Sequence, residues 1–204
     1  MEQVQDREIE VKFYVRNLAA VEERLRKSRA VLVQPRTHEF NLRFDTPTGD
    51  LARSYRVLRL RQDTASRLTY KGPAQLQEGV RIRQEIEFTV GDFHSARKFL
   101  EALGYQVCMI YEKYRTVYDL DQVHVALDEL PYGDFVEIEG PDTSSIYLVN
   151  QITGLNWEAS VPESYTMLFD SLRSEFNLPV RNLLFESFQG TGINVSKLNI
   201  KPAD

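Results

Sequence analysis

The stretch Arg7-Glu8-Ile9-Glu10-Val11-Lys12-Phe13-Tyr14-Val15 (REIEVKFYV) alternates charged or polar residues with apolar ones. Successive side chains of a β-strand point to opposite faces, so Glu8, Glu10 and Lys12 share one face while the apolar residues share the other. The tripeptide Glu-Ile-Glu recurs at residues 85–87 and 137–139. The pattern predicts strands that collect charge on one face, where paired carboxylates favour a hard divalent cation.

The same two-residue alternation recurs along the chain. It covers residues 38–44, 56–62, 67–72, 80–88, 111–118, 123–130 and 133–140. A single strand of this kind is most simply a solvent-facing surface strand, but here the polar face is Arg, Lys and Glu on strand after strand. Eight strands are enough to close a barrel with room for side chains or one small ligand. The sequence therefore predicts an eight-stranded antiparallel closed β-barrel with a charged lumen.

Segments with apolar residues at helical spacing lie between and after these strands. They run over residues 17–30, 92–104, 143–153 and 165–176. Strands and helices do not alternate regularly, so the predicted fold class is α+β, a barrel flanked by helices that cover its apolar exterior. We expect residues 1–176 to form the barrel domain and residues 177–204 to form an irregular or partly ordered C-terminal tail.

The composition limits the class of protein. The chain has 204 residues and a formal net charge of -5, so it lacks the basic balance of a nucleic-acid-binding protein. Its single cysteine, Cys108, excludes an intrachain disulfide and a thiolate-rich zinc site. The chain has no apolar run near the roughly 18 residues of a membrane span, and its acidic N-terminus is unlike a signal peptide. We expect a cytoplasmic protein with no membrane or nucleic-acid partner, and a homodimer stays open.

A lumen that collects charges of both signs needs a compensating ligand. Moving ions out of water costs several kcal/mol each unless they are paired or coordinate something. Arg and Lys match phosphate oxygens, and carboxylates hold Mg²⁺ or Mn²⁺, which bridge phosphate oxygens. A triphosphate with Mg²⁺ or Mn²⁺ is therefore the simplest ligand for such a lumen.

Several of these segments also resemble a known family. Glu8-Ile9-Glu10-Val11-Lys12 is similar to the E-x-E-x-K signature of the CYTH superfamily, the triphosphate tunnel metalloenzymes. Further similar motifs follow in family order, at residues 44–47, 58–61, 71–72, 83–87, 113–115, 127–128 and 133–139. The superfamily includes class IV adenylate cyclases, thiamine triphosphatases and inorganic triphosphatases.

The resemblance implies roles for particular residues. The catalytic residues would be Glu8, Glu10 and Lys12. The metal would be bound by Glu8, Glu10, Glu85, Glu87, Glu137 and Glu139. The triphosphate would be bound by Lys12, Arg59, Arg61, Lys71, Arg83, Lys113 and Arg115. For Arg43, Arg81, Glu87 and Asp128, a structural salt bridge is an equally open interpretation.

The resemblance thus implies a Mg²⁺- or Mn²⁺-dependent enzyme. Its substrate would be tripolyphosphate, ATP or another nucleoside triphosphate, or thiamine triphosphate, with hydrolysis slightly favoured. A class IV adenylate cyclase, which makes cyclic AMP and pyrophosphate from ATP, is the first alternative. Both reactions rest mainly on positioning and electrostatic stabilisation, so the charged residues do not discriminate between them. A non-catalytic sensor of polyphosphate or nucleotides is the second alternative, and an open sheet without a pocket is the third.

Overall fold

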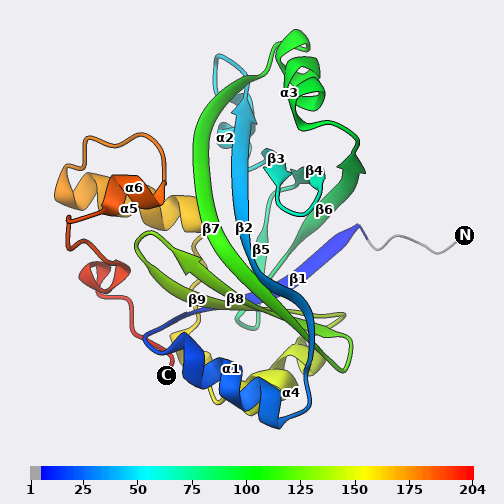
Figure 1. Ribbon diagram of the computed structural model, residues 1–204, viewed down its shortest axis with the longest axis vertical. Coiled ribbons are helices and arrows are strands. Elements are labelled where there is room, and N and C mark those ends of the chain that lie inside the picture. The colour runs from blue at the N-terminus through cyan, green and yellow to red at the C-terminus, as the bar shows by residue number, and fades with distance from the viewer. Residues whose placement is uncertain (1–5) are drawn as a thin grey trace, which may run out of the picture.

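The computed structural model describes residues 6–204, and its centre is a closed antiparallel β-barrel (Figure 1). Within this range nine strands follow the order β1-β9-β8-β7-β2-β3-β4-β6-β5, and a pairing between β1 and β6 closes eight of them into a ring. The predicted α+β barrel is therefore confirmed. The strands are Arg7–Val15 (β1), Val31–Asp45 (β2), Val57–Gln62 (β3), Ser66–Lys71 (β4), Gln75–Gln77 (β5), Val80–Val90 (β6), Gln106–Leu120 (β7), Val123–Leu130 (β8) and Gly133–Glu139 (β9).

Each alternating segment of the sequence coincides with or overlaps one of the eight barrel strands. The ninth strand, β5, pairs with β6 outside the closed ring. The sequence did not indicate β5 because three residues are too few to show an alternating pattern.

The register of the closing strands brings opposite charges together. On β1, Glu8 lies opposite Arg83 of β6, and Lys12 lies opposite Glu137 of β9. Side chains directly opposite on antiparallel strands have Cβ atoms about 4.5–5.5 Å apart. Backbone pairing alone therefore places these charged groups within contact distance.

Six α-helices are present in the described residues, and four match the predicted segments. The four begin at capping side chains, because Asn17, Asp92, Asp142 and Ser164 each accept a hydrogen bond from a backbone N–H of the first turn. None of the helices within residues 6–204 has the length and apolar character that a membrane crossing requires. The helices are Leu18–Lys27 (α1), Asp50–Arg53 (α2), Phe93–Ala102 (α3), Thr143–Thr153 (α4), Tyr165–Phe176 (α5) and Phe185–Phe188 (α6).

The longer helices cover the apolar outside of the barrel. Figure 1 shows α1 and α4 side by side at one end of the molecule and α3 at the other. Val21 and Leu25 of α1 and Ile146 of α4 are buried in one core cluster with apolar residues of β1, β8 and β9. A second cluster lies under α3, where Phe93 and Leu100 contact the outer faces of β2 and β3.

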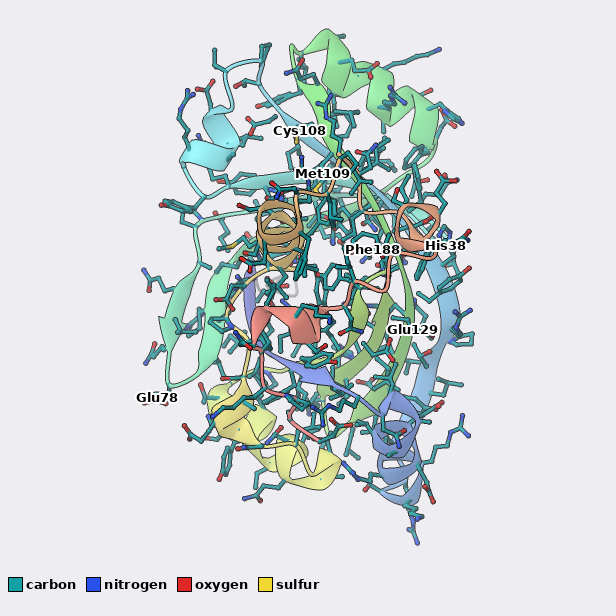
Figure 2. All side chains as sticks on the ribbon, turned by 90° about the vertical axis from the view of Figure 1, so that its left-hand side faces the viewer. His38, Glu78, Cys108, Met109, Glu129 and Phe188 are labelled. Carbon is teal, nitrogen blue, oxygen red and sulfur yellow. The ribbon has the colours of Figure 1, made fainter. Side chains whose placement is uncertain are left out.

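A third apolar cluster fills one end of the barrel beneath α5. Tyr14 and Phe135 lie on the same strand faces as Lys12 and Glu137, yet they pack with apolar residues of α5. The ring of Phe135 lies 5.1 Å from that of Tyr165. Figure 1 shows α5 beside the barrel, and Figure 2 views the same helix nearly end-on in front of the barrel. The lumen is consequently closed at this end by aromatic side chains.

Residues 177–204 pack along the barrel through scattered contacts. Leu183 exchanges backbone hydrogen bonds with β7 at Ile110 and Glu112, and the ring of Phe188, labelled in Figure 2, lies 6.0 Å from that of Phe169. The Asp204 carboxylate accepts hydrogen bonds of 2.7–3.1 Å from two backbone N–H groups just before α1. The division of the chain at residue 176 stays a prediction.

Candidate active site

The charged faces of the eight barrel strands point inward and form an enclosed lumen. Glu8, Glu10 and Lys12 on β1 are each only 5% exposed, and Asp128 on β8 has no exposed surface. Carboxylates and cations from different strands pair throughout this space. Charge therefore converges around a common axis, as the alternating pattern predicts.

Glu8 is the centre of the first group of ion pairs. One carboxylate oxygen accepts a hydrogen bond of 2.7 Å from Lys71 of β4, and the other accepts one from Arg83 of β6. Lys71 also lies 2.9 Å from Glu85. Burial favours protonation of Glu8, but the charges of Lys71 and Arg83 outweigh it and hold the pKa well below its usual range. Glu8 is thus a buried carboxylate whose charge is stabilised by two cationic partners.

Glu10 and Glu139 form the acidic side of the lumen. They are register partners on β1 and β9, and among the described residues the cations nearest Glu10 lie 3.6 Å away. Burial raises the pKa of Glu10, and the charges of Glu8 and Glu137 raise it further. Burial, with the charges of Glu8, Glu10 and Glu85, raises the pKa of Glu139 to about 7. Because Glu139 lies at the exposed rim, we attribute this shift mainly to the neighbouring carboxylates.

Asp128 is the centre of the second group. Its carboxylate accepts hydrogen bonds from Lys113 (2.9 Å), the Arg115 Nε (2.6 Å) and the Tyr165 hydroxyl (2.8 Å). Arg115 also contacts Glu137 of β9. Burial opposes the charge of Arg115, but Asp128 and Glu137 raise its pKa well above its usual value. This buried set carries two cations and two carboxylates.

Glu87 is the centre of the third group, on β3, β4 and β6. It accepts hydrogen bonds from Arg59 (3.2 Å), Arg61 (3.0 Å) and the Thr69 hydroxyl (2.7 Å). Arg61 also lies 3.6 Å from Glu39 of β2. Burial would raise the pKa of Glu39, but the lumen cations lower it to about 2. Arg61 is therefore held between carboxylates of β2 and β6, and Arg59 pairs with Glu87 of β6.

Cations of the lumen donate hydrogen bonds to residues 162–164, the segment that leads into α5. Lys12 Nζ donates to the backbone carbonyl of Glu163 at 3.1 Å and lies 3.3 Å from Glu137. The same ammonium lies 4.3 Å from the ring centre of Tyr165. Two further cations donate 2.7 Å hydrogen bonds, Arg81 to the Pro162 carbonyl in this segment and Arg43 to the hydroxyl of Thr166 in the first turn of α5.

Every residue predicted for the site lies on an inward strand face. Apart from Glu139, the structure brings the predicted cations and carboxylates into three groups of ion pairs, and the functional roles assigned to them stay predictions. Arg43, Arg81 and Asp128 also lie in the lumen and are paired there.

Sequence reasoning missed three residues that contact or line the lumen: Glu39, Asn41 and Tyr165. The alternation in residues 38–44 could have placed Glu39 and Asn41 beside Arg43, since all three share one face. Asn41 is fully buried, and neither of its amide atoms has a hydrogen-bond partner among the described residues. Tyr165 follows the apolar stripe of α5, so its helical spacing indicated only a core residue.

The donor chemistry of the lumen fits a hard divalent cation. The predicted ligands are all carboxylates, and oxygen ligands are those that Mg²⁺ and Mn²⁺ prefer. Within residues 6–204, no three His, Cys, Asp or Glu side chains are already arranged as a metal site. Burial and the acidic neighbours both raise the pKa values of the adjacent carboxylates Glu10 and Glu139, so this is the place where a cation would relieve repulsion.

Comparisons with solved structures show the same fold in other proteins. A candidate adenylate cyclase from Vibrio parahaemolyticus superposes with a TM-score of 0.71 at 22% identity, over 80% of this chain and 97% of that one. The PH1012 protein from Pyrococcus horikoshii OT3 superposes with a TM-score of 0.66 at 26% identity, over 78% of this chain and 98% of that one. HpAC1 from Hippeastrum is described as a candidate adenylyl cyclase that reveals a dominant triphosphatase activity. It superposes with a TM-score of 0.62 at 21% identity, over 80% of this chain and 95% of that one.

A comparison of the sequence with protein-family models assigns the chain to a family. A comparison with curated proteins finds no match. The family model of the CYTH domain matches residues 6–146, which contain the whole barrel and its charged lumen. The chain therefore belongs to the CYTH domain family.

Proposed function

We propose that this protein is a divalent-metal-dependent phosphohydrolase of tripolyphosphate or a nucleoside triphosphate. The observation that carries the proposal is the enclosed convergence of cations and carboxylates around Glu8. Membership of the CYTH domain family supports it, because the solved relatives include proteins described by adenylate cyclase and triphosphatase activity.

The lumen cations are suited to exchanging partners. Lys71 and Arg83 now bind Glu8, and Lys113 and Arg115 bind Asp128. A phosphate oxygen offers these cations the same charge-assisted hydrogen bonds that a carboxylate offers. We expect a triphosphate to take up part of this bonding without leaving any cation unpaired, while a bound divalent cation offsets the charge of the carboxylates that these cations leave.

The residues divide the work by charge. Lys12, Arg59, Arg61, Lys71, Arg83, Lys113 and Arg115 would hold the triphosphate and offset charge that develops on its oxygens during transfer. Glu8, Glu10, Glu85, Glu87, Glu137 and Glu139 would hold Mg²⁺ or Mn²⁺. The bound ion would supply Lewis-acid charge neutralisation and lower the pKa of a water molecule. Glu8 and Glu10, with Lys12 two residues on, would form the catalytic set.

The alternative is an adenylate cyclase that works in the same lumen. The Vibrio parahaemolyticus relative is described as a candidate for that activity. In cyclisation, the ribose 3′ hydroxyl of ATP attacks the α-phosphorus and pyrophosphate leaves, whereas in hydrolysis water attacks the terminal phosphorus. Only the products separate the two reactions.

The test is a substrate panel with product analysis. Tripolyphosphate, ATP and thiamine triphosphate are incubated with Mg²⁺ or Mn²⁺, and phosphate, pyrophosphate and cyclic AMP are measured. We expect phosphate release that a chelator abolishes. Cyclic AMP with an equal amount of pyrophosphate would replace hydrolysis by cyclisation, and tight binding without turnover under either metal would indicate a sensor.

A matched pair of lysine variants localises the activity. We expect Lys12→Ala and Glu10→Ala each to abolish turnover while the circular dichroism spectrum stays that of the wild type. Lys27→Ala, at an exposed lysine of α1 that pairs with Glu23 of the same helix, should leave turnover unchanged. Turnover in Lys12→Ala equal to that in Lys27→Ala would remove the lumen as the site.

A further inference from the structure

Tyr165 makes three separate contacts with the charged groups of the lumen. It is the first residue of α5 and lies outside the residues matched by the CYTH domain family model. Its hydroxyl donates to Asp128 at 2.8 Å. Its ring centre lies 4.3 Å from the ammonium of Lys12 and 5.2 Å from that of Lys113. One neutral side chain thus touches a lumen carboxylate and two lumen cations.

The position of Tyr165 is fixed from several sides. The Tyr132 hydroxyl donates to the backbone carbonyl of Tyr165 at 2.8 Å, and the ring of Phe135 packs against it at 5.1 Å. Ser164 caps α5 directly before it, and Lys12 holds the carbonyl of Glu163. A side chain held this firmly can act as a fixed reference for the mobile ends of lysine side chains.

The hydroxyl of Tyr165 competes with cations for Asp128. Asp128 also accepts from Lys113 and Arg115, and a phosphate must draw these two cations away from it. A hydroxyl that occupies part of the acceptor capacity of a carboxylate lowers its hold on each cation. The Tyr165 hydroxyl should therefore make Lys113 and Arg115 more available to phosphate.

The ring of Tyr165 acts differently from a carboxylate. Cation–π attraction holds an ammonium group over the ring without adding a negative charge, so the ammonium keeps its attraction for phosphate. Lys12 and Lys113 both lie within the distance at which this attraction is effective. The ring can thus keep both ammonium groups in place when their carboxylate partners turn away.

We propose that Tyr165 is a positioning residue for triphosphate turnover, which holds Lys12 and Lys113 by its ring and loosens the grip of Asp128 by its hydroxyl. The inference rests on the proposed function. It assigns a role in the reaction to α5, which follows the family-matched residues.

Two substitutions separate the hydroxyl from the ring. Tyr165→Phe keeps the ring and should raise KM for tripolyphosphate roughly 3- to 10-fold with kcat within about twofold, because a pure binding contribution is lost. Tyr165→Leu loses both the hydroxyl and the ring. It should lower kcat/KM by about 30-fold or more, through a lower kcat as well as a higher KM. An unchanged KM in Tyr165→Phe would overturn the proposal.

The control for packing is Tyr118→Phe. Tyr118 is buried in the apolar cluster under α1, and its hydroxyl bonds Glu22 and Arg26 of that helix. We expect Tyr118→Phe to lower the melting temperature at least as much as Tyr165→Phe and to leave KM unchanged. Equal rises of KM in the two variants would show a structural effect and refute a positioning role.

A double-mutant cycle tests the route through Asp128. In an Asp128→Asn background, Tyr165→Phe should change KM by less than twofold, since a neutral amide has no strong hold on Lys113. Additive effects would contradict the mechanism. A wild-type protein that neither binds nor turns over any triphosphate would refute the proposed function itself, whereas an active wild type with an unchanged Tyr165→Phe variant would refute only the role of Tyr165.

Discussion

Glu10 of β1 and Glu139 of β9 are register partners, and their carboxylates lie on the same inward face of neighbouring strands. Like charges directly opposite in a sheet destabilise it. Glu8 and Glu137, two residues away along the same strands, have cations closer to them than Glu10, whose nearest arginines lie 3.6 Å away. The acidic excess of the lumen is therefore concentrated at one pair of residues.

Replacing one member of this pair should stabilise the metal-free protein. We expect Glu139→Gln to raise the free energy of unfolding by about 0.2–1 kcal/mol in the presence of a chelator, because it removes the repulsion. Added Mn²⁺ should raise the melting temperature of the wild type more than that of the variant. Glu23→Gln on the exposed face of α1 is the control. Identical responses to Mn²⁺ in the wild type and Glu139→Gln would argue against a cation at this pair.

The buried carboxylate of Asp128 should be far more costly to remove. Asp128→Asn leaves Lys113 and Arg115 short of a negative partner, and breaking a buried pair of this kind typically costs about 3–5 kcal/mol. We expect urea unfolding to show a loss of this size. Tripolyphosphate should stabilise the variant more than the wild type, since phosphate oxygens can replace the lost carboxylate. An equal shift in both proteins would place the phosphates away from Asp128.

Most of the fold could be predicted from the alternation of polar and apolar residues along the strands. The two-residue period in segments such as residues 7–15 and 80–88 reports directly which side chains face inward, so both the barrel and its charged lumen could be predicted. The helices α4 and α5 could also be predicted from their apolar spacing. Strand β5 and helices α2 and α6 could not, because three or four residues show no period.

The partners within the lumen could not be predicted in the same way. Alternation shows that Lys12 and Glu137 face inward, but only the strand order shows that they are neighbours across β1 and β9. The role of Tyr165 depends on how α5 docks against the end of the barrel, which no local pattern records. An apolar stripe along a helix predicts that a side chain is buried, but it does not predict which polar atom that side chain contacts.

Asp134 should make stability depend on pH outside the lumen. Burial and the charge of Glu129 raise its pKa to about 6, above the usual value of 3.8. The folded state therefore binds a proton that the unfolded state has already lost, so this group favours folding below pH 4 and loses that contribution as the pH rises through 6. Asp134→Asn should flatten this decline and raise the melting temperature at pH 7.5. A similar gain at pH 3.5, where the carboxyl is protonated in both states, would contradict the assignment.

Asn41 should show a conflict between stability and ligand binding. Its amide is fully buried without a hydrogen-bond partner among the described residues, so Asn41→Leu should raise the free energy of unfolding by about 1–3 kcal/mol. The matched control is Asn150→Leu, which should destabilise because that buried amide donates to the Leu155 carbonyl at 3.0 Å. If Asn41 is kept for a ligand, the stabilised variant should bind tripolyphosphate more weakly in calorimetry. If Asn41→Leu is more stable and binds tripolyphosphate as tightly as the wild type, the amide does not contribute to ligand binding. If Asn41→Leu loses stability as Asn150→Leu does, Asn41 is a structural residue.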